Sequence, residues 1–291
     1  MSVTRPKGIT LALIGALVLT PDALFMRLSG MDGFQMLGWR GLCMGTIFVL
    51  AWALTSRDRG GDVAALATGA AATVIVCQYF NAMLFPLGIG SAPVAPVLLG
   101  VATVPVWSAL LSGWLYGETT SRATWAAIAA VLAGLTLAVT DKGDAALDAR
   151  AALGLACGLG VALSLAMNFV TLRHHPRLPL LLAIGVGAWL ASATGWTVTG
   201  PARMDDGRLW AVLVTGIVIL PLAFFSLSAA SRHTAAANVS LLLLLETVLA
   251  PIWVWLALSE TPSPRMLAGG ALVIGSLALY LLHARRGAGL A

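Results

Sequence analysis

The chain has 291 residues, of which 59% are hydrophobic and only 10% are charged. Soluble domains carry about 25% charged residues, so this composition excludes an ordinary water-soluble protein. The net charge of +5 does not indicate a nucleic-acid partner, because the basic residues stand at the ends of apolar runs, where they set membrane topology.

Apolar runs of about 20 residues, the length that a bilayer requires, follow one another along the whole chain. The first run continues past Pro21 without a small-residue cleavage site, so we predict an uncleaved span rather than a signal peptide. The pattern predicts an all-α polytopic membrane protein with ten transmembrane helices. The predicted spans are 8–28, 33–54, 62–86, 91–116, 121–140, 151–172, 178–199, 207–230, 235–257 and 264–283.

Three ionisable residues fall inside these spans: Asp22 in the first, Arg40 in the second and Glu246 in the ninth. Such residues are functional candidates by default, because a charge in hydrocarbon is costly. Arg40 is either a counter-ion for one of the two carboxylates or a substrate ligand. Asp22 lies close to the predicted outer surface, where we expect water to solvate it. Glu246 lies near the midplane, so it either binds a substrate ammonium or exchanges protons, and Asp22 is the second candidate for proton coupling.

Smaller polar residues pair along the third and sixth spans. Residues four positions apart share a helix face, so Tyr79 lies with Met83 and Ser164 lies with Asn168. One aromatic ring, one thioether and small polar groups suit a cavity for neutral amino acids, whereas the alternative role is hydrogen bonding between helices. The predicted substrate-binding residues are Tyr79, Met83, Ser164, Asn168, Asn238, Glu246 and Arg40. Gln78 and Asn81 lie on neighbouring faces of the third span and are alternative contributors.

An internal repeat divides the chain near its middle. The fourth span runs into Gly117-Glu118-Thr119 and the ninth into Ser259-Glu260-Thr261, an offset of 142 positions (260 − 118 = 142). A repeat of five spans is odd, so the second copy is inverted relative to the first, which is the architecture of many secondary transporters with a site near the midplane. We predict repeats at 1–140 and 151–291, connected by a loop at 141–150, around a central cavity.

The distribution of basic residues predicts the orientation. With a cytoplasmic N-terminus, ten Lys and Arg residues face the cytoplasm and six face the other side, with Arg40 in the membrane. This excess places both termini in the cytoplasm by the positive-inside rule. We therefore expect a multi-pass protein of the bacterial inner membrane.

The run from Gly90 to Pro96, Pro105 deeper in the fourth span and the Gly117-Glu118 exit resemble the drug/metabolite transporter superfamily of EamA type. Arg40 also matches a common position of this family, and the run from Thr234 through Pro251 to Glu260 repeats the pattern in the second half. The resemblance covers nearly the whole chain. It is similar above all to bacterial exporters of aromatic and other neutral amino acids.

This resemblance implies that spans one to four and six to nine surround a central cavity, with spans five and ten at the periphery. One departure concerns the ninth span, where Thr247 stands opposite Pro105 and the proline comes four residues later, at Pro251. We therefore expect the fourth and ninth spans to bend differently.

The composition and the resemblance together predict a secondary transporter that exports small neutral metabolites, mainly amino acids, by alternating access. The alternatives are efflux of other small molecules or cationic drugs, a passive facilitator or channel, and a membrane sensor or assembly subunit without transport. We expect no enzyme activity, cofactor or metal site, because the four histidines lie at predicted cytoplasmic ends and no H-E-x-x-H motif occurs. A monomer in the lipid bilayer is the expected form.

Overall fold

The computed structural model describes residues 4–92, 94–139, 149–258 and 264–288. Within these ranges all regular secondary structure is helical. Pro93, Glu260 and the predicted connecting loop up to residue 148 lie outside the described residues. The helices are α1 (Thr4–Leu19), α2 (Asp22–Ser29), α3 (Gly33–Thr55), α4 (Arg59–Ala65), α5 (Gly69–Ser91), α6 (Val94–Val101), α7 (Val104–Tyr116), α8 (Arg122–Val139), α9 (Ala149–His174), α10 (Leu180–Thr199), η1 (Pro201–Arg203), α11 (Leu209–Val214), η2 (Thr215–Ile219), α12 (Leu220–Ser231), α13 (Ala236–Leu243), α14 (Leu245–Leu258) and α15 (Pro264–Ala288).

Eight helical segments of the described chain are long and apolar enough to cross a membrane, and two shorter apolar helices lie in α8 and α15. The chain is therefore a multi-pass membrane protein. The predicted bounds of the third span are wrong: it runs from residue 69 to 91 rather than from 62 to 86, because α4 is a separate short helix. The fourth span accordingly begins at residue 96 rather than 91. The side chain of Thr68 caps the new start by accepting a hydrogen bond from the Ala71 N–H at 3.3 Å.

The fourth and ninth spans are both interrupted, at Ala102-Thr103 and at Leu244, which are separated by the repeat offset of 142 positions (244 − 102 = 142). The two spans are therefore interrupted at equivalent positions, and the expected difference in how far they bend stays a prediction. Pro105 lies in the first turn of α7, where its missing N–H removes no helical hydrogen bond. In the ninth span the Thr247 hydroxyl donates to the Leu244 carbonyl at 2.7 Å, a bond that favours bending of the helix.

Two further spans of the bundle are interrupted beside prolines. Between α1 and α2 the helix breaks at Thr20-Pro21. Between α11 and α12 the chain forms the π-helical turn η2, in which the Leu220 N–H donates to the Thr215 carbonyl. Pro221 follows directly and cannot donate to the carbonyl four residues before it. The π-helical turn gives backbone groups near this proline hydrogen-bond partners five residues away instead of four.

Small residues bring α3 and α10 into close contact. A Cβ at Gly41 would lie 2.6 Å from the Ala188 carbonyl oxygen, and one at Gly45 would lie 2.9 Å from the Gly185 carbonyl oxygen. Neither position therefore has room for a larger side chain. The Ser192 hydroxyl adds a hydrogen bond of 2.7 Å to the Gly38 carbonyl. This contact joins the second span to the seventh, one from each half of the chain, without needing large apolar side chains.

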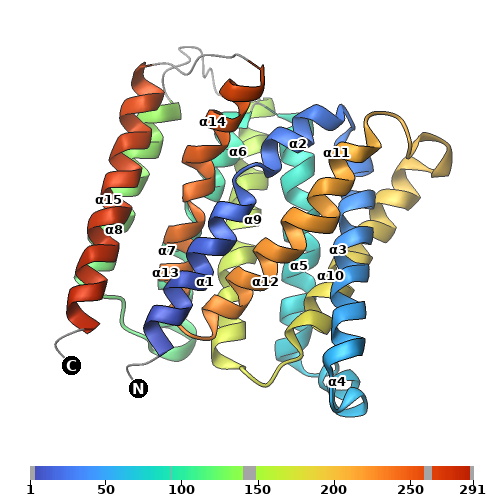
Figure 1. Ribbon diagram of the computed structural model, residues 1–291, viewed down its shortest axis with the longest axis horizontal. Coiled ribbons are helices and arrows are strands. Elements are labelled where there is room, and N and C mark those ends of the chain that lie inside the picture. Colours follow the sequence, from blue (N-terminus) through green and yellow to red (C-terminus); the bar gives the residue numbers. More distant parts are fainter. Residues whose placement is uncertain (1–3, 93, 140–148, 259–263, 289–291) are drawn as a thin grey trace.

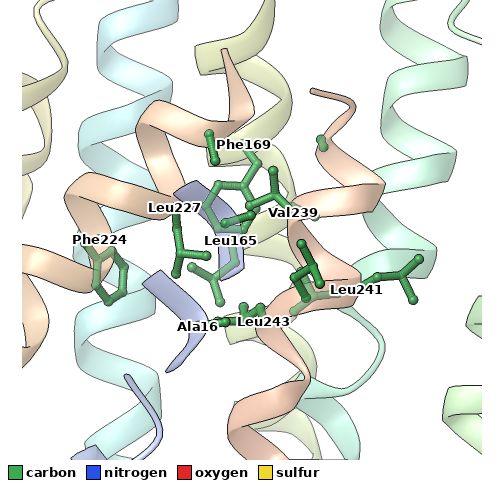
Figure 2. Packing of buried hydrophobic residues seen from close by; sticks show 14 of the residues in the cluster. Ala16, Leu165, Phe169, Phe224, Leu227, Val239, Leu241 and Leu243 are labelled. Carbon is green, nitrogen blue, oxygen red and sulfur yellow. The ribbon is translucent and has the colours of Figure 1, made fainter. Parts of the chain in front are cut away.

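Two helices lie apart from the rest of the bundle. α8 and α15 lie side by side at one edge of the molecule, and both chain ends lie at the same end of the bundle (Figure 1). The remaining helices surround a core in which side chains from α1, α9, α12 and α13 interdigitate (Figure 2). Several of these core residues also form one wall of a cavity: Leu165, Phe224, Leu227 and Leu243.

Candidate functional site

The central feature of the bundle is a buried ion pair. Arg40 on α3 donates from Nη2 to Asp22 Oδ2 at 2.7 Å, and the two side chains are 8% and 2% exposed. Asp22 is the first residue of α2, directly after the break at Pro21, and a carboxylate is favourable at a helix N-terminus. The expectation that water solvates Asp22 is therefore wrong, because the interrupted first span places it inside the protein.

The π-helical turn η2 helps to position the arginine. A Cβ at Gly216 would lie 2.8 Å from Cys43 Cβ and 3.3 Å from the Arg40 Cα, so glycine at this position lets η2 approach α3 at the level of the arginine. The eighth span is interrupted at the same place. The location of Arg40 thus depends on irregular backbone in a neighbouring helix.

Asp22 and Arg40 line a cavity together with Glu246, the second residue of α14, which follows the break at Leu244. Leucine, valine, phenylalanine and methionine side chains make up much of the remaining lining. The lining residues come from ten helices of both halves, α1–α3, α5, α6, α9, α10 and α12–α14, while α8 and α15 contribute none among the described residues.

The cavity has a volume of ≈ 70 Å³. Pockets for small molecules measure about 300–1,000 Å³. A small-molecule ligand of ordinary size can therefore enter this cavity only if the surrounding helices move apart. The breaks in the first, fourth, eighth and ninth spans lie around it and supply places where such movement is possible.

The ion pair leaves part of its hydrogen-bonding capacity unused. Asp22 Oδ1 and Arg40 Nη1 are buried without a hydrogen-bond partner among the described residues, and so is Gln78 Oε1 on α5. All three residues line the same cavity. A buried donor or acceptor without a partner costs about 1–3 kcal/mol, so the cavity wall offers two acceptors and one donor to whatever enters.

Comparison with known proteins identifies the family. The sequence matches the EamA-like transporter family over residues 6–140 and again over residues 152–282. The chain belongs to the EamA-like transporter family. The two matches show two EamA repeats, one in each half.

Relatives of this EamA transporter include the pseudopaline exporter CntI from two strains of Pseudomonas aeruginosa, UCBPP-PA14 and PAO1. Each is 25% identical over 205 residues, which is 70% of this chain and 69% of CntI. A protein crystal structure superposes with a TM-score of 0.79 at 21% identity, covering 97% of this chain and 99% of the other. That likeness shows the fold of the EamA transporter.

The residues of the third and sixth spans that helical spacing pairs do not line this cavity. Tyr79 lies in a separate groove between α5 and α10, where its hydroxyl is 3.1 Å from the Thr194 hydroxyl. Helical spacing paired four residues, and none of them lines the cavity. These are Tyr79, Met83, Ser164 and Asn168. Gln78 and Asn81, the alternatives on neighbouring faces of the same span, do line it. Four-residue spacing identifies a shared face but not the neighbour that this face meets.

Asn168 and Asn238 have different surroundings. Asn168 is 1% exposed on α9, and its Oδ1 has no hydrogen-bond partner among the described residues. The Asn238 amide connects two other side chains: its Nδ2 donates to the Thr234 hydroxyl at 3.0 Å, and its Oδ1 accepts from the Tyr280 hydroxyl at 2.5 Å. Asn238 thus connects α13 to α15, at the edge of the molecule, by a hydrogen bond.

A second charged cluster lies at the ends of two membrane-spanning helices, α7 and α9. Arg173 donates from Nε to Glu118 Oε1 at 2.8 Å, and His174 Nε2 is 3.5 Å from the same oxygen. The Tyr116 ring stacks on the His174 ring at 3.6 Å. These partly exposed groups connect the end of the fourth span to the end of the sixth. Across the described residues no group of three His, Cys, Asp or Glu side chains could hold a metal ion.

Proposed function

We propose that the chain is a secondary transporter that exports small zwitterionic metabolites, amino acids above all, through the central cavity. The observation that carries this proposal is the buried Asp22–Arg40 pair, which keeps one acceptor, Asp22 Oδ1, and one donor, Arg40 Nη1, free beside Glu246. An α-amino acid carries a donor and an acceptor group side by side. Its carboxylate accepts from Arg40, and its ammonium donates to Asp22 and Glu246.

Charge balance supports a role for Glu246 in proton exchange. The cavity holds two carboxylates and one guanidinium, so one negative charge is uncompensated whenever both carboxylates are ionised. An unpaired charge away from water is costly; a proton on Glu246 neutralises it, and a substrate ammonium beside Glu246 pairs with it. Proton and ammonium therefore compete for Glu246, which couples proton entry to substrate exit.

The proposed architecture is ten spans in two inverted five-helix repeats, with α8 and α15 as the peripheral fifth and tenth spans. The small cavity and the interrupted helices support alternating access, because opening to either side requires movement about the breaks. The excess of basic residues at the end that carries both termini supports a cytoplasmic location for that end in the bacterial inner membrane. The 25% identity with an exporter supports outward transport.

Efflux of cationic compounds is the second candidate function, because the cavity carries one carboxylate more than its guanidinium can neutralise. A cationic substrate without a carboxylate would use Asp22 and Glu246 but leave Arg40 Nη1 unpaired. The zwitterion uses all of these groups, so we prefer it.

Counterflow in liposomes containing the purified protein tests the proposal. Vesicles loaded with an excess of unlabelled compound are diluted into trace labelled compound, using a panel of neutral amino acids, basic amino acids and organic cations. We expect neutral amino acids to exchange well above the level in protein-free vesicles. Exchange of the organic cations without exchange of any amino acid would select the second candidate, and exchange of neither class would contradict both.

A further inference from the structure

Gln78 is a buried polar side chain of the cavity wall that the ion pair does not use. It is 1% exposed, and its Oε1 has no hydrogen-bond partner among the described residues. It comes from α5, whereas Asp22, Arg40 and Glu246 come from α2, α3 and α14. A carboxamide oxygen buried without a donor is unfavourable, so a donor that enters the cavity is its natural partner.

The structure holds this side chain in a defined place. Its stem lies against Gly187 of α10, where an added Cβ would lie 2.8 Å from Gln78 Cβ and 3.1 Å from Gln78 Cγ. The same added atom would lie 2.7 Å from the Ile75 carbonyl oxygen. Glycine at position 187 therefore lets α10 close over the stem of Gln78, which limits the movement of its amide.

Asn81 extends the same patch by one helical turn. It is 6% exposed and lines the cavity beside Gln78. A carboxamide both donates and accepts hydrogen bonds without carrying charge. The two amides on α5 thus complement a hydroxyl or carboxamide, and they offer no counter-ion to a charged side chain.

We propose that Gln78, assisted by Asn81, determines specificity by selecting substrates whose side chain carries a hydroxyl or carboxamide. This proposal rests on the proposed function, in which Asp22, Arg40 and Glu246 hold the charged groups common to all amino acids. The amides on α5 then recognise the group that differs between substrates.

Threonine and valine provide a matched comparison, because they have nearly the same shape and differ in one hydroxyl. Threonine gives Gln78 Oε1 a donor, whereas valine presents a methyl group and leaves the oxygen unpaired. Sites built to bind a hydroxyl discriminate strongly against the analogue that lacks it. We expect the wild-type protein to prefer threonine over valine by about tenfold or more.

The experiment measures counterflow of labelled threonine and labelled valine by the full-length protein in liposomes. Gln78→Met keeps the length of the side chain and removes the amide, and Gln78→Leu is a second variant in case the first is poorly produced. Thr73→Val is the matched control, because it also removes a polar group from α5. The Thr73 hydroxyl donates to the Gly69 carbonyl at 2.9 Å, and Thr73 does not line the cavity.

We expect either Gln78 variant to reduce the threonine-to-valine ratio to about one while valine exchange persists, and we expect Thr73→Val to keep the wild-type ratio. A wild-type ratio near one, or a preference that survives both Gln78 substitutions, would overturn the assignment and leave the proposed function standing. Absence of any amino-acid exchange by the wild-type protein would overturn the two together.

Discussion

Asp22 and Arg40 depend on each other, because removing either one leaves the other as an unpaired charge in a nonpolar environment. Breaking a buried pair from one side costs about 3–5 kcal/mol because an uncompensated charge remains, whereas replacing both partners leaves no unpaired charge. The pair also lines the cavity, so its effect on stability and its effect on transport have to be measured separately.

We predict that Arg40→Gln and Asp22→Asn each lower the thermal unfolding midpoint in detergent, and that the double variant recovers most of the loss. Transport should remain absent in the double variant, because the substrate carboxylate and ammonium have both lost their charged partners. Unfolding followed by tryptophan fluorescence and counterflow of the same preparations provide the two readouts. Recovery of transport together with stability would mean that the pair is purely structural.

Glu246→Gln tests proton coupling. The amide is nearly the same size as the carboxylate but cannot take up or release a proton. We predict that this variant loses substrate accumulation driven by a pH gradient and keeps counterflow, which needs no net proton movement. A loss of both activities in a folded variant would show that the substrate ammonium requires a charged ligand at position 246, and unchanged activity in both assays would remove Glu246 from the mechanism.

The residues of the site differ in how far the sequence predicts them. Asp22, Arg40 and Glu246 stand out because ionisable groups in apolar runs are rare and costly. The sequence leaves open which carboxylate pairs with Arg40, and in the structure this partner is Asp22. Asp22 lies at a helix break that hydropathy averaged over the whole span does not show. Gln78 is harder to choose over Tyr79, because adjacent helix faces are distinguished only by the neighbouring helices.

The hydropathy of the sequence predicts the membrane spans but does not show where a span is interrupted. All four broken spans are apolar on average, so an average over about 20 residues treats each of them as one helix. Prolines indicate some breaks, at Pro21 and Pro221, but the break at Leu244 has no proline within the next six residues. The repeat offset predicts it from its counterpart at Ala102 better than any local pattern does.

Thr247→Pro tests this equivalence of the two breaks. Position 247 corresponds to Pro105 by the repeat offset and lies in the first turn of α14, where a proline is tolerated. We predict that the variant is produced at near wild-type levels and unfolds within a few degrees of the wild type. Ala162→Pro, in the middle of the uninterrupted helix α9, should cost about 3 kcal/mol or more. Equal damage from both substitutions would contradict the equivalence.

At the scale of the whole molecule, the proposed inversion of the two halves has a direct geometric consequence. Both chain ends, the connection between α3 and α4, and the connection between α9 and α10 lie at one end of the bundle (Figure 1). The turn between α10 and α11 lies at the other end. If one half were not inverted, equivalent loops of the two halves would face the same side of the membrane rather than opposite sides.

Cysteine labelling in intact cells tests this topology. Single cysteines at positions 57, 177 and 205 are introduced after the native Cys43, Cys77 and Cys157 have been replaced with alanine. Arg177 and Asp205 are both exposed, and a cysteine at position 177 leaves the neighbouring Arg173–Glu118 ion pair in place.

We predict that a membrane-impermeant thiol reagent labels position 205 in intact cells and labels positions 57 and 177 only after the membrane is permeabilised. The reason is that two inverted five-span repeats place the second-to-third and sixth-to-seventh connections inside and the seventh-to-eighth connection outside. Counterflow of each variant shows that the labelled protein is folded. Labelling of positions 57 and 177 from opposite sides would exclude the inverted repeat, and labelling of both from outside would reverse the orientation that the basic residues predict.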